Sequence, residues 1–216
     1  MNAAPATDRP YTPRELAADA AIHGLGVLFA VIAGPILIAM AAARGEAPAV
    51  VAVSIYAVAL LAVFVFSAFY NFVSAPRWRE SLRRLDHSAI YFKIAGSYTP
   101  FAAVSLAGGV GQALLIAVWA VAGVGMALKL AAPRRFEAAS VPVYLGLGWA
   151  FVWVGADARA ALAPEALALL VAGGLLYSLG VGFHLWRRLP YQNAIWHLFV
   201  LGGTACIYAA IAVEIA

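Results

Sequence analysis

The sequence predicts an all-α integral membrane protein, a seven-transmembrane-helix bundle with its N-terminus in the cytoplasm and its C-terminus outside. Apolar residues make up 65% of the 216 residues and charged residues only 11%, whereas soluble domains are about half apolar and about a quarter charged. The apolar residues gather in stretches of the length that crosses a bilayer core of about 30 Å, which takes about 20 helical residues. Lipid is therefore the main solvent of this chain, and no room remains for a separate soluble domain.

The seven predicted spans are separated by polar, charged or glycine-rich breaks. We place them at 18–43, 49–74, 87–107, 110–131, 139–156, 164–186 and 193–214. A short cytoplasmic tail, 1–11, precedes one seven-helix membrane domain, 12–216.

Two local signals refine the first and third spans. Thr12, followed by Pro13 and three residues later by Glu15, predicts a helix start with a capping box. The third span is the least apolar and contains Pro100, where we expect a kink whose freed carbonyl is satisfied by neighbouring groups. Its Lys93 is open to two interpretations, an ion pair with Asp86 or snorkelling toward the membrane surface.

The lysines and arginines predict the orientation. Eleven of the 14 fall on one side of the predicted bundle: Arg9, Arg14, Arg77, Arg79, Arg83, Arg84, Lys129, Arg134, Arg135, Arg187 and Arg188. The other side receives Arg44 and Arg159, and Lys93 lies within a span. Because cytoplasmic loops are rich in Lys and Arg, the first side is expected to be cytoplasmic. The net charge of +4 thus reports topology and does not indicate nucleic-acid binding.

Polar residues gather at the cytoplasmic end of this topology. Ser67 and Asn71 are four apart near the end of the second span, and Asn193 and His197 are four apart at the start of the seventh, so each pair shares a helix face. Asp86 opens the third span at the same level. Polar groups inside a membrane are costly and indicate function, although Asn and Ser also serve as hydrogen-bonding contacts between helices.

Several motifs carry a resemblance to a known family. They are Ser67-Ala-Phe-Tyr-Asn71, Leu85-Asp86-His87-Ser88-Ala89-Ile90-Tyr91, Ala95-Gly96-Ser97-Tyr98-Thr99-Pro100-Phe101 and Asn193-Ala-Ile-Trp-His197. With these motifs the chain resembles, over nearly its whole length, the hemolysin III family, the bacterial branch of the adiponectin and progestin receptor superfamily. The resemblance implies a seven-helix fold with the N-terminus inside and a bacterial inner (plasma) membrane location.

The resemblance also implies a zinc ion near the cytoplasmic face, with three histidine ligands and an aspartate that contacts the metal through water. The positions that match those ligands hold Asn71, Asn193 and His197, so two of the three expected histidines are asparagines. Asp86 and Ser67 are retained. Because zinc prefers imidazole, thiolate or carboxylate ligands, this set predicts a weak site. Whether His23, His87 or His184 replaces the missing ligands stays open at this point.

Two functions follow. The first is a non-enzymatic membrane protein that is receptor-like, lipid-binding or related to permeability and cytolysis, as the family's name suggests. The alternative is a zinc-dependent hydrolase of a lipid amide or ester, in which Asp86 and Ser67 are catalytic and His197 binds the metal. The sequence favours the first because of Asn71 and Asn193. Membrane lipid is the expected partner in both cases.

Overall fold

The computed structural model describes residues 10–106, 108–132, 134 and 137–216, the last without the side chains of 137 and 138. These residues form α-helices and two short helices of other types, and they contain no strand. The helices are α1 (Pro13–Ala43), α2 (Ala47–Phe72), α3 (Pro76–Pro100), α4 (Gly109–Ala131), α5 (Glu137–Gly148), α6 (Gly155–Ala161), α7 (Pro164–Leu185) and α8 (Gln192–Ile215). A π-helix, η1 (Phe101–Ser105), follows α3, and a 3-10 helix, η2 (Ala150–Val154), joins α5 to α6.

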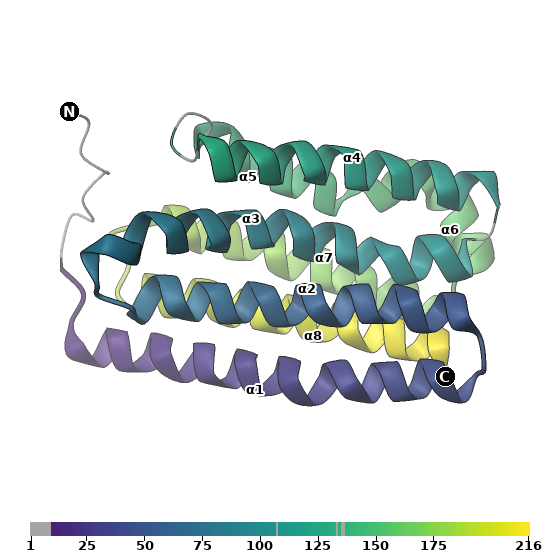
Figure 1. Ribbon diagram of the computed structural model, residues 1–216, viewed down its shortest axis with the longest axis horizontal. Helices are drawn as coiled ribbons and strands as arrows, with labels where there is room; N and C mark the ends of the chain where they lie inside the picture. The colour runs from purple at the N-terminus through teal and green to yellow at the C-terminus, as the bar shows by residue number, and fades with distance from the viewer. Residues whose placement is uncertain (1–9, 107, 133, 135–136) are drawn as a thin grey trace.

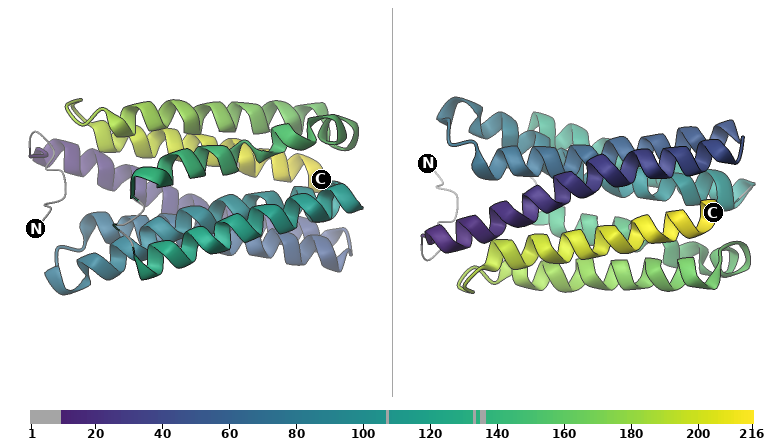
Figure 2. Two further views of the ribbon diagram at one scale, coloured as in Figure 1. Left: turned by 90° about the horizontal axis from the view of Figure 1, so that it is seen from above. Right: turned by 90° about the horizontal axis from the view of Figure 1, so that it is seen from below.

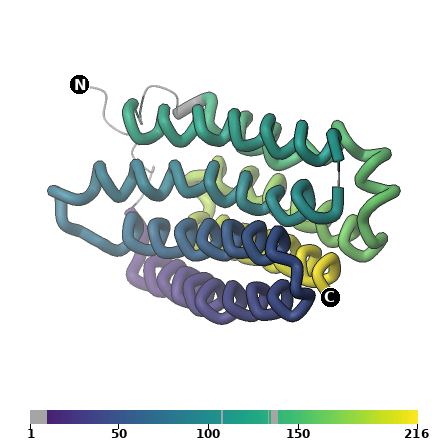
Figure 3. The backbone as a smooth tube through the Cα atoms, turned by 45° about the vertical axis from the view of Figure 1, so that its right-hand side comes forward, coloured from purple at the N-terminus to yellow at the C-terminus, as the bar shows by residue number. Residues whose placement is uncertain are grey.

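The helices run side by side along one long axis (Figure 1). Going round the bundle, α4 packs on α3, α3 on α2, α2 on α1, α1 on α8 and α8 on α7. The stretch from α5 to α6 lies beside α4 and α7, as the two turned views show (Figure 2). The last turn of α1 and the first turn of α2 meet at the end where α8 finishes (Figure 3).

Within the described residues, six helices are long and apolar enough to cross a membrane: α1, α2, α4, the stretch Ala139–Ala161, α7 and α8. The prediction of a helical, multi-pass membrane protein is therefore confirmed. Their outer faces are covered by large exposed apolar side chains, such as Leu25, Val58, Ile116 and Leu179. Such a surface suits lipid and is unlike that of a soluble protein of this size.

The third helix differs from its predicted bounds. The sequence indicated a span at 87–107, but α3 begins at Pro76, and the segment 76–86 forms its first turns. Pro76 stands at the first position of the helix, where a missing N–H costs nothing. The charged residues of these turns keep α3 from qualifying as an apolar span. Pro100 ends the α-helix, and the chain continues as η1, so the expected irregularity is present.

The predicted fifth span, 139–156, is broken into three helical pieces. The α-helix α5 gives way at Gly148 to η2, and α6 extends the segment to Ala161, beyond the predicted end. The hydroxyl of Tyr98 donates to the carbonyl of Gly148 (2.7 Å) and accepts from the N–H of Phe151 (3.2 Å). A side chain of α3 thus satisfies backbone groups that the break frees, as a membrane interior requires.

The capping box that starts α1 is confirmed. The Thr12 hydroxyl accepts from the Glu15 N–H (3.3 Å), and the Glu15 carboxylate accepts from the Thr12 N–H (2.8 Å). The predicted tail, 1–11, lies almost entirely in 1–9, outside the described residues.

Glycines let α7 and α8 approach each other closely. A Cβ on Gly173 would lie 3.1 Å from the Gly203 carbonyl, and one on Gly180 would lie 2.8 Å from the Phe199 Cβ. Gly182 is an exception, because a Cβ there would have no atom within 4 Å. These contacts hold α7 against α8, which carries part of the site described below.

Gly26 lets α1 pack closely on Phe64 of α2. A Cβ on Gly26 would lie 2.5 Å from Cδ1 of the Phe64 ring, which is buried in the core. We expect Gly26→Ala to destabilise the bundle by about 1–3 kcal/mol, because the ring must shift in a packed core. Melting of the detergent-purified protein measures the effect. Gly123→Ala, where a Cβ meets nothing within 4 Å, should leave the melting temperature unchanged or raise it, since alanine is the better helix former.

Candidate functional site

Three polar residues of α1 follow one another at intervals of four and face the bundle interior. Glu15, Asp19 and His23 are each only 4% exposed, although the surrounding helix is apolar. Residues four apart share a helix face, so one stripe of α1 brings two carboxylates and an imidazole inside the bundle. Buried ionisable groups at membrane depth require partners.

Glu15 fixes the start of α8 against the start of α1. Its Oε1 accepts from the backbone N–H of Tyr191 (2.7 Å), the one described non-glycine residue with a positive φ, 58°. The hydroxyl of Tyr11 contacts Oε1 of Gln192 (3.0 Å), whose amide nitrogen donates to the carbonyl of His184 (2.9 Å). These contacts place the first turns of α8 beside the stripe on α1.

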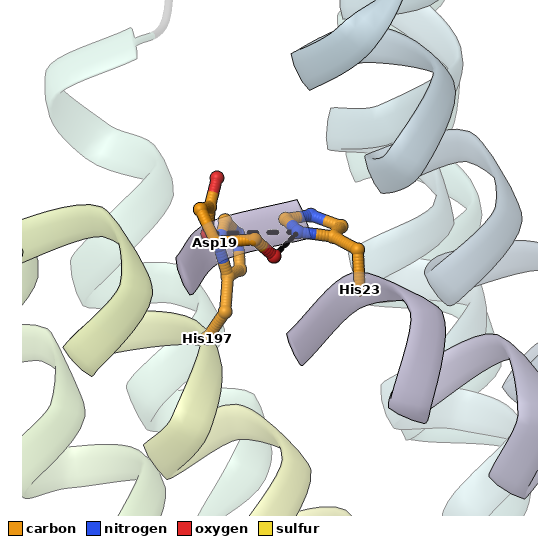
Figure 4. A group of neighbouring side chains, drawn as sticks. All are labelled: Asp19, His23 and His197. Atoms are coloured by element: carbon orange, nitrogen blue, oxygen red, sulfur yellow. Dashed lines mark hydrogen bonds and ion pairs between the residues drawn. The ribbon is translucent and has the colours of Figure 1, made fainter. Parts of the chain in front are cut away.

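Asp19 is the centre of the resulting cluster. Its Oδ1 lies 2.6 Å from Nδ1 of His197, and its Oδ2 accepts from the amide of Asn193 (2.7 Å). Figure 4 shows Asp19 and His23 reaching from α1 and His197 from α8, with the three side chains turned toward one another. A carboxylate with both oxygens paired is tolerated in the interior, whereas an isolated one is not.

His23 joins the cluster from the other side. Its Nδ1 lies 2.9 Å from the backbone carbonyl of Asp19, which can only accept, so Nδ1 carries a proton. In the neutral ring Nε2 then presents a lone pair, toward which the Ser67 hydroxyl (3.2 Å) and the Asn71 amide (3.4 Å) lie. The rings of His23 and His197 are 4.1 Å apart between centroids.

The cluster closes through the two asparagines. The amide of Asn193 donates to Oδ1 of Asn71 (3.3 Å), and the amide of Asn71 also donates to the carbonyl of Ser67 (2.9 Å). We call the six residues together the Asp19 cluster: Asp19, His23, Ser67, Asn71, Asn193 and His197. The two pairs singled out in the sequence, one on α2 and the other on α8, therefore meet inside the bundle.

Asp19, His23 and His197 could hold a metal ion. Each offers one ligand atom, and these atoms all lie within 4.8 Å of one another. Two imidazoles and a carboxylate are ligands that zinc and other divalent transition metals accept. These three residues thus fit such an ion better than Asn71, Asn193 and His197, the positions that match the zinc ligands implied by the family resemblance.

Asp19 was missed as a site residue at the level of sequence, and His23 was left between a helix contact and a ligand role. A signal was available, since Asp19 and His23 are four apart on the first span and His197 opens the last. Adjacency of the first and last helices is common in closed bundles, but the facing side of each helix depends on packing.

The other sequence-predicted residues lie apart from the hydrogen bonds of the Asp19 cluster. Asp86 pairs with its neighbour His87, whose Nδ1 is 3.2 Å from Oδ2. The ring of His87 also packs against that of Tyr70, and the ring of His184 against that of Trp196, with 5.0 Å between the latter centroids. Neither His87 nor His184 belongs to the group of possible metal ligands, which is Asp19, His23 and His197.

Lys93 follows neither interpretation that the sequence left open. It is buried, and its ammonium group donates to the Tyr177 hydroxyl (2.8 Å), which in turn lies 2.7 Å from the Thr204 hydroxyl. The ammonium also lies 5.1 Å from the centre of the Tyr177 ring. Hydroxyl and aromatic contacts, rather than Asp86 or the membrane surface, therefore accommodate this charge.

A groove opens between α1 and α2 beside the Asp19 cluster. It has a volume of about 460 Å³ and is lined by Ala20, His23, Gly24, Val27, Leu28, Val31, Ala68 and Phe72. His23 is the one polar side chain among these residues, and the edge of its ring packs on Phe72 with centroids 5.1 Å apart. The groove thus connects the apolar face of the bundle to the cluster.

Comparison with known proteins agrees with the motifs. Residues 15–208 match the family model described as "Haemolysin-III related". The chain is similar to "Hemolysin-3" of Bacillus cereus, 40% identical over 195 residues, which are 90% of this chain and 89% of the relative. It is likewise 38% identical to the "Hemolysin-3 homolog" of Bacillus subtilis (strain 168), over 92% of this chain and 93% of the relative.

A mammalian protein shares part of this similarity. The human "Monocyte to macrophage differentiation factor" is 31% identical over 166 residues, which are 73% of this chain and 67% of its own. No solved structure matches the chain. With a family model that covers most of its length and bacterial relatives that it spans almost completely, this chain belongs to the haemolysin-III-related family of membrane proteins.

Proposed function

We propose that the chain is a metal-dependent membrane hydrolase of a lipid amide or ester, with a zinc ion held by Asp19, His23 and His197. The observation that carries this is the convergence of three buried or half-buried ligand side chains within 4.8 Å. Asp19 and His23 of α1 supply the ligands that Asn71 and Asn193 do not provide. The resemblance pointed to zinc at this end of the bundle, and the donor set fits it.

The proposal includes a seven-span topology with the cluster at the cytoplasmic end. Seven spans result when α3 is counted as a span and Ala139–Ala161 as one span. In the structure α1 and α8 start at the same end of the bundle, and α8 finishes at the other end (Figure 1). The described basic residues at the starting end are Arg14, Arg77, Arg79, Arg83, Arg84, Lys129, Arg134, Arg187 and Arg188. The predicted cytoplasmic Arg9 and Arg135 lie outside the described residues. The positive-inside rule supports this end as cytoplasmic and, for a bacterial relative, the inner membrane.

Glu80 links two of these basic segments outside the apolar region. Its carboxylate accepts from Arg83 (3.2 Å) and from Arg134 (3.4 Å), which follows α4. The hydrogen bond from Arg83 and the charges of the neighbouring arginines lower the pKa of Glu80. The carboxylate is therefore charged at neutral pH and joins α3 to the segment after α4, at the end that carries the Asp19 cluster.

Each residue of the cluster has a role in the proposed reaction. When bound, a zinc ion supplies a Lewis acid and makes water a nucleophile at neutral pH. Asp19 and the two histidines would hold the ion, and Asn193 would keep the carboxylate of Asp19 in place through its 2.7 Å hydrogen bond. The Ser67 hydroxyl and the Asn71 amide are donors directed at the same point, beside Nε2 of His23. They are suited to stabilise the negative charge that develops on a carbonyl oxygen.

A hydrolysis assay tests this function. Detergent-purified protein loaded with zinc is incubated with a ceramide-like lipid amide and with a lipid ester, and the released fatty acid is measured. We expect Ser67→Ala to lower kcat by about 10²–10³-fold, the usual cost of losing one oxyanion donor, without changing the zinc content. Ser54→Ala, on the same helix but outside the cluster, is the matched control. Wild-type protein that holds zinc but converts neither lipid would refute the enzymatic proposal.

A non-enzymatic lipid-binding protein is the second candidate function. It is favoured by the hydrogen bonds within the Asp19 cluster, where both carboxylate oxygens of Asp19 already have partners in His197 and Asn193. A metal is not needed to stabilise such a network. Under this alternative the purified protein retains lipid but neither zinc nor hydrolysis, so the same assay separates the two candidates. A pore is not favoured, because the cluster occupies one end of the bundle.

A further inference from the structure

We propose that the groove between α1 and α2 holds one acyl chain of a bilayer lipid and delivers the headgroup end of that lipid to the Asp19 cluster. The inference rests on the proposed function for its chemistry, because it names the route by which a lipid substrate enters the site. It adds a binding surface that the cluster itself does not include.

The groove lies on the outer, apolar face of the bundle. Leu28 and Val31 line it and are 55% and 53% exposed, and neighbouring Leu25 is 57% exposed. In a membrane protein such a face contacts hydrocarbon, so the occupant adjacent to the opening is a lipid chain. The volume of about 460 Å³ falls within the range of about 300–1,000 Å³ that small-molecule sites span.

The groove runs lengthwise along α1. Ala20, Gly24, Leu28 and Val31 succeed one another along one stripe of α1, over eleven residues or about 16 Å at 1.5 Å per residue. One end of this stripe lies at the level of His23, and the other lies deeper among apolar side chains. A lipid has the same polarity along its length, with a polar carbonyl region at one end and hydrocarbon at the other.

Gly24 has no packing role in the bundle. A Cβ at Gly24 would meet no atom within 4 Å, whereas one at Gly26 would collide with the ring of Phe64 at 2.5 Å. Glycine lowers helix stability by about 1 kcal/mol relative to alanine, so packing explains Gly26 but not Gly24. Together with Ala20 and Ala68, Gly24 removes the side-chain volume that would otherwise fill the groove next to His23.

Gly24→Leu tests the proposal, because a Cβ at Gly24 meets no atom within 4 Å and a leucine side chain there adds volume to the groove. The protein is reconstituted in phosphatidylcholine vesicles that contain a phosphatidylcholine with a photoactivatable diazirine in its acyl chain. Cross-linked peptides are then mapped by mass spectrometry. In the wild type we expect labelling to be enriched on residues 20–31 of α1 and 68–72 of α2. In Gly24→Leu it should fall at least about fivefold there and stay constant on the other helices.

Gly182→Leu is the matched control, since a Cβ at Gly182 also meets no atom within 4 Å but lies outside the groove. It should label like the wild type. Uniform labelling around the wild-type bundle, or unchanged α1 labelling in Gly24→Leu, would overturn the proposal that the groove holds an acyl chain.

Zinc content and lipid hydrolysis are measured on the same samples, so that failure of the groove proposal can be told apart from failure of the proposed hydrolase function. Enriched labelling in a protein without zinc would retain the groove and reject the metal-dependent reaction. Zinc binding and hydrolysis with uniform labelling would retain the reaction and reject this route. If both proposals hold, Gly24→Leu keeps its zinc and loses most of its lipid hydrolysis.

Discussion

Asp19→Asn is expected to lower the affinity for zinc at least about 100-fold and to abolish lipid hydrolysis. Loss of an outer-shell partner alone costs about 10–100-fold in metal affinity, and Asp19 is proposed as a ligand. The substitution removes the negative charge that faces His197 at 2.6 Å and keeps a side chain of the same size that still forms hydrogen bonds. The protein should therefore fold, and competition with a fluorescent zinc chelator measures the affinity.

Asp157→Asn is the control for this substitution. Asp157 lies exposed on α6, outside the Asp19 cluster, so the loss of one carboxylate there should leave the zinc affinity unchanged. Equal affinity in Asp19→Asn and the wild type would show that Asp19 is not a ligand. Asp86, which the sequence proposed as the acidic residue of the site, would then return as the candidate.

Asn71→His is expected to have the opposite effect, a gain in zinc affinity of about tenfold or more, equivalent to about 1.4 kcal/mol. The amide of Asn71 lies 3.4 Å from Nε2 of His23 and contacts Asn193, so an imidazole at this position would reach the proposed ligands. Zinc prefers imidazole to a neutral carboxamide. The substitution also places histidine at a position where the family resemblance implies one.

The same chelator competition measures this gain. Gln112→His, exposed on α4, adds an imidazole away from the cluster and should not change the affinity of the tight site. An unchanged or weaker affinity in Asn71→His would mean that the ion does not lie between α1, α2 and α8. The two substitutions therefore test the proposed ligand set from both directions.

Much of the fold follows from local sequence chemistry. Apolar stretches of membrane-spanning length gave the helices, and the Thr12–Glu15 capping box fixed the start of α1 to the residue. The failures occur where tertiary contacts override local pattern. The charged start of α3 is helical from Pro76, and the fifth apolar stretch is broken at a point where Tyr98 of another helix satisfies the carbonyl of Gly148.

The candidate site was half visible in the sequence. Ser67, Asn71, Asn193 and His197 could be grouped from their spacing and from the orientation of the predicted spans, and they do meet in one cluster. Spacing within α1 places Asp19 and His23 on one face but does not pair Asp19 with His197, which is 178 residues away, because that contact depends on how α1 and α8 are rotated. Close packing decides that rotation, and no periodicity in either helix encodes it alone.

Elemental analysis of the purified protein determines whether Asp19, His23 and His197 hold a zinc ion. Wild-type protein and His197→Ala are purified in detergent, incubated with excess zinc, passed through a desalting column and measured by mass spectrometry for metal per chain. His184→Phe, a histidine variant outside the Asp19 cluster, is measured beside them. We expect about one zinc per chain in the wild type and in His184→Phe, and a near-complete loss in His197→Ala. Equal metal content in the wild type and His197→Ala, or none in either, would contradict it.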